Sequence, residues 1–89
     1  MNLDYEKIPE YMREGLRLYI DHGIEPGSFL TALLENNLVK AYQTADNINI
    51  AHMKDWVSFL YWELPSDCWG SPQVVQTWLE TKGTEGETE

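Results

Sequence analysis

The sequence predicts an all-α fold, in which a compact bundle of four to five short helices is followed by a disordered acidic tail. Apolar residues recur at helical spacing along most of the chain, and no segment alternates apolar and polar residues as a half-buried strand does. Glycine and proline separate the helical segments. With 89 residues, 43% of them hydrophobic, the chain suits one small domain. We expect a single helical domain over residues 1–82 and the disordered tail over residues 83–89.

The first predicted helix opens near Pro9, a residue suited to the first helical position, and runs to Asp21. One of its faces carries the apolar residues Met12, Leu16, Tyr19 and Ile20. Gly23 follows where helices commonly end with a left-handed residue, and Ile24 is placed to fold back on the last turn, as in a Schellman ending.

Two shorter helical segments are expected next. One begins at Pro26 or just after it, and Asn36-Asn37 is its stop signal. Residues 38–45 also have a helical pattern, which continues or kinks the preceding helix, and Asp46-Asn47 breaks it.

The most regular helix is expected over residues 49–63, before Pro65. Its apolar residues step by three and four along a narrow seam with heptad spacing: Ile50, Met53, Val57, Leu60 and Leu64. Four aromatic residues widen this seam to most of the circumference: Trp56, Phe59, Tyr61 and Trp62. A helix that is apolar nearly all round is either buried on several sides or buried on one side and docked on another chain.

The last predicted helix begins at Ser71-Pro72, with Ser71 as the N-cap and Pro72 at the first helical position. Its inward-facing residues are Val74, Val75, Trp78 and Leu79, and Gly83 ends it.

Six basic and fifteen acidic residues give the chain a formal net charge of −9. This charge disfavours nonspecific binding to a nucleic-acid backbone, because phosphates need cations. It suits a basic protein surface, although an acidic composition also serves solubility alone. The single cysteine, Cys68, excludes an internal disulfide and fits a reducing cytoplasm. The polar N-terminus and the lack of a long apolar run predict a cytoplasmic protein with neither a signal peptide nor a membrane span.

Catalytic and metal-binding patterns are weak. Cys68, His22 and His52 are of the types that supply a nucleophile and a base, but nothing in their spacing brings them together. Two histidines without a glutamate at ligand spacing make a poor zinc site. The stretch 46–49 lacks the glycine and the distal glutamate of a calcium loop. The sequence therefore predicts a protein that is not an enzyme and that holds no metal or cofactor.

Two predicted helix starts resemble each other: Pro26, Gly27, Ser28 and Phe29 in one, and Trp69, Gly70 and Ser71 in the other. The free N–H groups of a first helical turn attract anions, glycine lets a ligand approach the backbone, and an aromatic ring stacks on a base. Capping and turn geometry alone also account for these residues. As an anion or nucleotide site, the two corners would form one pocket, with supporting charge from Arg13, Arg17, Lys40 and Lys54.

The run HGIEPGSFL, the later Ala45-Asp46 and the WGSP near the end resemble motifs of a group of small phage-encoded accessory proteins. The resemblance covers about residues 8–80. That group has no established activity, so the resemblance implies no functional residue. It implies a phage or prophage origin and an accessory role that acts stoichiometrically on host machinery, including immune systems.

Two functions fit these observations best. The first is a non-enzymatic, phage-type binding protein, a host-defence antagonist that sequesters a small anionic ligand such as a nucleotide signal in the host cytoplasm. The alternative is an acidic inhibitor that covers a basic surface of a host nucleic-acid-binding or immune protein. We expect a homo-oligomer in either case, because one core of this size is marginal by itself. A small enzyme that uses Cys68 or His52 is a third possibility.

Overall fold

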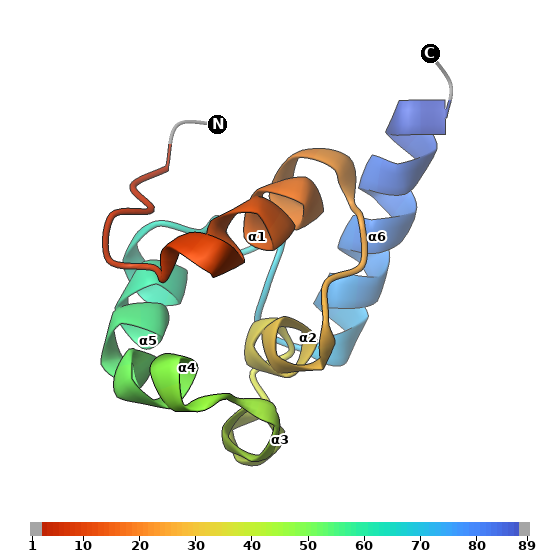
Figure 1. Cartoon of the computed structure of the whole chain (residues 1–89). Helices are drawn as coiled ribbons and strands as arrows, with labels where there is room; N and C mark the ends of the chain where they lie inside the picture. Colours follow the sequence, from red (N-terminus) through yellow and green to blue (C-terminus); the bar gives the residue numbers. More distant parts are fainter. Residues whose placement is uncertain (1–2, 88–89) are drawn as a thin grey trace.

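The computed structural model describes residues 3–87, which form six helices and no strand (Figure 1). In chain order the helices are α1 (Glu10–His22), α2 (Ser28–Leu34), α3 (Leu38–Thr44), α4 (Asn47–Ala51), α5 (Met53–Trp62) and α6 (Pro72–Glu87). The all-α prediction is therefore confirmed for this part of the chain. Among the helices described, none is both long enough and apolar enough to cross a membrane.

One cluster of buried apolar side chains joins the helices. Leu16, Tyr19 and Ile20 of α1 belong to it, on the face that the sequence predicts. Trp56 of α5 is fully buried, and its indole Nε1 donates a 3.1 Å hydrogen bond to Oδ1 of Asn49. Asn49 is itself only 3% exposed. This bond therefore removes most of the cost of burying both polar groups.

The end of α1 confirms the predicted left-handed residue at Gly23 but not the Schellman pattern of hydrogen bonds. Gly23 has a φ of 64°, and its N–H donates to the carbonyl of Tyr19 at 3.0 Å. The bond from Gly23 is that of the simpler left-handed ending, and the N–H of Ile24 donates to the carbonyl of Leu18 at 3.3 Å. A Schellman motif would instead join Ile24 to Tyr19 and Gly23 to Ile20. The same turn lies very close to α6, because a Cβ added at Gly23 would lie 2.7 Å from the backbone nitrogen of Gly83.

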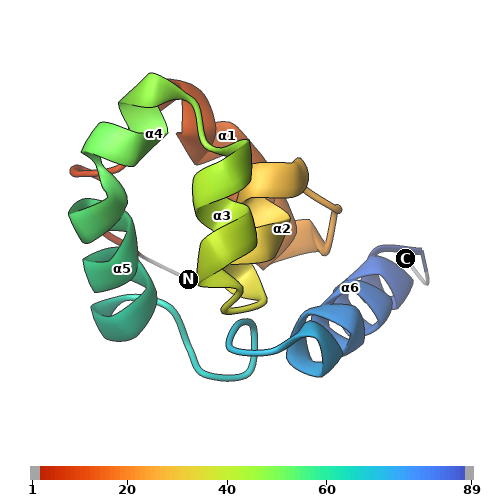
Figure 2. The ribbon, with the colours of Figure 1, turned by 90° about the horizontal axis from the view of Figure 1, so that it is seen from below.

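The short helices α2, α3 and α4 are separated by local caps. Asn36, with a φ of 63°, lies just after α2, and the side chain of Asn37 accepts a hydrogen bond from the Lys40 N–H to begin α3. Oδ1 of Asp46 accepts a 2.7 Å hydrogen bond from the Asn49 N–H and begins α4. Figure 2 shows α3 beside α2 on one face of the molecule, with α5 on one side of them and α6 on the other.

The helix predicted over residues 49–63 is two helices. His52, with φ −103° and ψ 13°, ends α4 and begins α5. The predicted heptad seam is wrong at two positions, since Ile50 is 44% exposed and Val57 is 50% exposed. The core instead takes four residues of α5: Met53, Trp56, Phe59 and Leu60. The break at His52 gives α5 an orientation independent of α4. The rings of Trp56 and Phe59 then fill the interior in place of the smaller Ile50 and Val57 side chains.

The last helix begins as predicted and ends later. Oγ of Ser71 accepts a 3.2 Å hydrogen bond from the Val74 N–H, which is the expected N-cap. α6 then continues through Gly83 to Glu87, and residues 88–89 of the predicted acidic tail lie outside the described residues. Gly83 is therefore not the end of the helix. It lies against Gly23, where the absence of two side chains allows α1 and α6 to approach closely.

Candidate protein-binding surface

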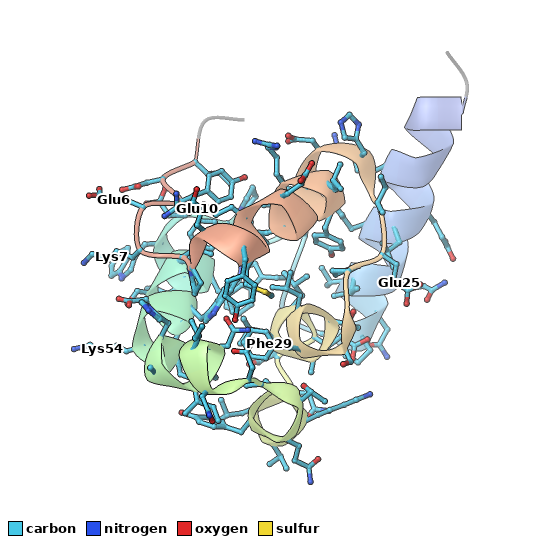
Figure 3. All side chains as sticks on the ribbon, viewed as in Figure 1. Glu6, Lys7, Glu10, Glu25, Phe29 and Lys54 are labelled. Atoms are coloured by element: carbon cyan, nitrogen blue, oxygen red, sulfur yellow. The ribbon has the colours of Figure 1, made fainter. Side chains whose placement is uncertain are left out.

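The first of the two predicted anion corners lies at the N-terminus of α2. Gly27 is the N-cap residue, and both Gly27 and Ser28 are exposed. The carbonyl of Pro26 accepts a 3.2 Å hydrogen bond from the hydroxyl of Thr31, which fixes the turn. Phe29 is buried and packs edge-on against Trp56, with ring centroids 5.6 Å apart (Figure 3). Its ring belongs to the core and is not exposed for stacking on a base.

The second corner has a different local structure. The Gly70 N–H donates a 2.8 Å hydrogen bond to the carbonyl of Leu34, and Gly70 has a φ of 123° that favours glycine. Ser71 uses its hydroxyl to cap α6. Trp69 is half-buried against α2 and α5 side chains. These bonds account for Gly70 and Ser71 as turn and cap residues.

The fold does not bring the two corners together. Ser28 is the first residue of α2, whereas Gly70 is bonded to Leu34, which is the last. A helix of seven residues is about 10 Å long. The corners therefore lie at opposite ends of α2, and a single pocket does not form from both. Binding of an anion at one corner alone stays a prediction.

The four cations assigned to that pocket are also dispersed. Arg13 is engaged with the N-terminal segment, because Nε donates to the Ile8 carbonyl at 2.9 Å and Nη2 to the Glu6 carbonyl at 3.0 Å. Arg17 lies exposed on α1 and Lys40 on α3. Lys54 lies in the first turn of α5 and points outward, away from Phe29 (Figure 3). The four cations thus come from three different helices, and their support of one anion site stays a prediction.

Cys68 has the environment of a packing residue. Its side chain is fully buried, and Sγ donates to the carbonyl of Pro65 at 3.3 Å. Burial raises the pKa of the Cys68 thiol to about 12. The thiol is therefore protonated near neutral pH, and the nucleophilic thiolate is scarce. His52 lies elsewhere, with Nδ1 3.0 Å from a carboxylate oxygen of Asp55.

The most prominent surface feature was not predicted as a site. Large apolar side chains of α3 and α5 are exposed, and we call them together the α3–α5 surface. They are Leu38 at 57%, Val39 at 72%, Tyr42 at 47%, Val57 at 50%, Tyr61 at 67% and Trp62 at 76% exposed. Three of them, Leu38, Val57 and Tyr61, line one pocket. Exposed apolar patches of this kind mark docking sites in soluble proteins. The sequence signal for it was the near-complete apolar circumference of residues 49–63, which left docking on another chain as one of two alternatives.

One side of α5 borders an apolar groove. We define the apolar groove by its lining residues, which come from α2, α3, α5 and the turns that connect them: Leu33, Asn36, Asn37, Leu38, Val57, Leu60, Tyr61 and Trp69. None of these side chains carries a charge. Trp69, which the sequence assigned to an anion site, is thus part of a wall suited to apolar contact.

The other side of α5 borders an acidic cavity. Its lining residues are Asp4, Lys7, Ile8, Asp55, Ser58, Phe59, Trp62 and Glu63. The lining includes three acidic residues and one lysine, and its apolar part includes Trp62, whose side chain is exposed. Oδ2 of Asp55 also lies 3.0 Å from Nδ1 of His52. The Trp62 ring stands edge-on to that of Tyr61, with centroids 4.8 Å apart at 86°. Carboxylates beside an exposed indole are the groups that pair with a protein cation.

The acidic cavity depends on contacts between distant parts of the chain. The Asp4 N–H donates a 3.2 Å hydrogen bond to Oε1 of Glu63, and the ring of Tyr5 lies 5.5 Å from that of Phe59. Arg13 holds the same N-terminal segment through its two bonds to backbone carbonyls. Figure 1 shows this segment running beside α5. The sequence gives no local signal for the cavity because its walls are about 50 residues apart.

Comparison of the chain with protein-family models, curated proteins and solved structures finds no match. In the part of the chain that the structure describes, no three His, Cys, Asp or Glu side chains are grouped so as to hold a metal ion. The geometry of the two cavities is thus the main evidence on function.

Proposed function

We propose that the protein is a non-enzymatic binding protein that captures a basic segment of a partner protein at the acidic cavity. The observation that carries this proposal is the placement of Asp4, Asp55 and Glu63 around one cavity with Trp62, whose side chain is 76% exposed. A large exposed tryptophan is uncommon on a monomer and frequent at the centre of protein interfaces.

Arginine is the side chain that fits this cavity best. A guanidinium group stacks on an indole and pairs with carboxylates through a planar fork of donors, which a lysine ammonium lacks. The cation–π contact contributes about 0.5–1 kcal/mol at an exposed site, and each exposed ion pair contributes about 0.2–1 kcal/mol. One arginine thus supplies a few kcal/mol, so the partner must add further contacts on the neighbouring surface of α5.

The net charge of −9 supports the same class of partner. An acidic protein attracts a basic surface over the Debye length, which raises the association rate and makes it sensitive to salt. Lys7 opposes this effect inside the cavity, since its ammonium competes with the incoming cation. Nucleic-acid-binding proteins have basic surfaces because they neutralise phosphates. Given the resemblance to phage accessory proteins, we propose a host nucleic-acid-binding or immune protein as the target, which would be inhibited when its basic surface is covered.

The proposal is tested with a labelled helical peptide of arginine and leucine, whose binding is followed by fluorescence anisotropy. Glu63→Gln removes a cavity charge but keeps the oxygen that accepts from the Asp4 N–H. Glu25→Gln is the matched control, because it removes the same charge from the exposed turn between α1 and α2 (Figure 3). We expect Glu63→Gln and Trp62→Ala each to weaken binding severalfold and Glu25→Gln to leave it nearly unchanged.

Lys7→Glu provides the opposite change. Replacing the cavity lysine with a fourth carboxylate should strengthen peptide binding severalfold, and raising the salt concentration should weaken it. Equal effects of Glu63→Gln and Glu25→Gln would show that only net charge matters. That outcome, or a peptide that fails to bind, would contradict the acidic cavity as a docking site.

A further inference from the structure

The apolar groove and the outer face of α3 form a second surface whose charge differs from that of the rest of the chain. Residues 26–45 contain one acidic residue, Glu35, and one basic residue, Lys40, so their formal net charge is zero. The remaining residues carry the whole charge of −9. A basic partner gains little from this neutral region, whereas two copies of an acidic chain meet here with the least repulsion. We propose that a second copy of this chain docks at the apolar groove and α3 to form a two-fold dimer.

The exposed apolar side chains supply a substantial part of the area that a dimer interface needs. Leu38, Val39, Tyr42, Val57 and Tyr61 are each about half exposed or more. An aromatic side chain alone can bury roughly 150–250 Å². Because each of the five is already partly buried, together they supply only part of the roughly 800 Å² that each partner of a standard interface buries, and neighbouring polar residues must supply the rest.

The surface has both a ridge and a groove, which two-fold pairing requires. α3 lies at one edge of the molecule with its outer face uncovered by the other helices (Figures 1 and 2). Val39, at 72% exposed, projects from this helix, and the apolar groove lies between α3 and α5. In a two-fold dimer, the α3 ridge of one copy packs into the groove of the other, and the reverse contact follows by symmetry.

Dimerisation leaves the acidic cavity open. Val57, Leu60 and Tyr61 line the groove, whereas Asp55, Phe59 and Glu63 of the same helix line the cavity. Residues at these positions of a helix point in different directions. The dimer is therefore independent of the proposed capture of a basic segment, and a dimer would present two acidic cavities to a partner.

Sedimentation equilibrium of the full chain tests the dimer. We expect mass to shift from one chain to two as concentration rises, and the dimer to strengthen between about 50 mM and about 0.5 M salt because screening reduces the repulsion between two acidic copies. Peptide binding at the acidic cavity changes in the opposite direction with salt. Failure of one proposal is therefore distinguishable from failure of the other.

Val39→Glu and Val57→Glu place a carboxylate on the proposed interface, where it would be buried against uncharged side chains without a partner. Each should raise the dimer dissociation constant at least tenfold and leave the circular dichroism spectrum unchanged, because both residues are half exposed or more. Ile24→Glu is the matched control, since Ile24 is 50% exposed and lies outside this surface. A species of single-chain mass up to about 1 mM, or a dimer that Ile24→Glu weakens as much as Val39→Glu, would overturn the proposal. Persistence of the dimer in both Val39→Glu and Val57→Glu would overturn it as well.

Discussion

At the junction of α1 and α6, Tyr19 and Trp78 are buried, whereas on the α3–α5 surface Tyr61 and Trp62 are 67% and 76% exposed. The buried pair has partners for its polar groups. The Tyr19 hydroxyl donates to the Cys68 carbonyl at 2.7 Å, and the indole N–H of Trp78 donates to the Tyr19 carbonyl at 2.9 Å. In the exposed pair, the two rings contact each other, with their centroids 4.8 Å apart. One tyrosine–tryptophan pair therefore stabilises the fold, and the other is accessible to a partner.

The largest expected difference between the two regions is the effect of removing a tryptophan ring. Trp78→Ala should lower the free energy of unfolding by about 3–5 kcal/mol, because it opens a cavity in the core and removes a hydrogen bond. Trp62→Ala should change it by about 0.5 kcal/mol or less, as expected for an exposed position. Urea unfolding followed by circular dichroism measures both. A large loss of stability in Trp62→Ala would mean that the α3–α5 surface is part of the folding core.

The second prediction concerns the close approach of α1 and α6. Gly23→Ala should destabilise the fold by about 2–4 kcal/mol for two reasons. A residue with a side chain is strained in the left-handed backbone conformation of Gly23, and the new Cβ would lie 2.6 Å from Cβ of Lys82. Gly15→Ala is the matched control. Gly15 lies within α1, and the nearest side-chain atom to an added Cβ is Cδ1 of Leu30 at 4.0 Å. It should stabilise the protein by about 0.5–1 kcal/mol, as alanine does within a helix. If Gly23→Ala is neutral, the α1–α6 junction is looser than its geometry implies.

The sequence predicts well the features that depend on near neighbours. The left-handed turn at Gly23 and the cap by Ser71 each involve bonds that span only a few residues. Their chemistry is therefore visible in a short window of sequence. The apolar face of α1 is likewise determined by spacing within one helix.

Features that depend on tertiary packing were harder to predict. The regular apolar spacing around Val57 is equally compatible with burial and exposure, and the choice depends on where His52 interrupts the helix. Gly83 has the composition of a helix end, yet its role is close approach to Gly23 across 60 residues of sequence. The acidic cavity is built from residues that only the fold brings together. The pairing of two helix starts into one pocket was a similar long-range inference, and the fold separates them.

The third prediction concerns the hydrogen bond between Tyr19 and the loop before α6. Tyr19→Phe removes the donor to the buried Cys68 carbonyl with little change in shape, so the free energy of unfolding should fall by about 1–3 kcal/mol. Tyr61→Phe removes a hydroxyl from a residue that is 67% exposed and should have almost no effect. Thermal unfolding of the two variants side by side compares the two regions without altering the packing of either ring. Equal stability would mean that water replaces the hydroxyl as the partner of the Cys68 carbonyl.

The smallest expected effect lies at the start of α4, where Asp46 both caps the helix and accepts a hydrogen bond from the Tyr11 hydroxyl. The Tyr11 bond is the main reason that the pKa of Asp46 is below its usual value, and it raises the pKa of Tyr11 to about 12. A carboxyl whose pKa is depressed by folding contributes stability above its unfolded pKa, near 3.9. That contribution is lost as pH falls through the lower folded value.

Tyr11→Phe should therefore raise the Asp46 pKa in an NMR titration and reduce the stability lost on acidification. Tyr42→Phe, which changes an exposed tyrosine of α3, should leave the Asp46 titration unchanged. The effect on stability is small because both Tyr11 and Asp46 are exposed. An unchanged Asp46 pKa in Tyr11→Phe would show that the helix cap, rather than the Tyr11 bond, depresses it. The N-terminus of α4 would then be stabilised by the local sequence alone, as the other predictable caps of this chain are.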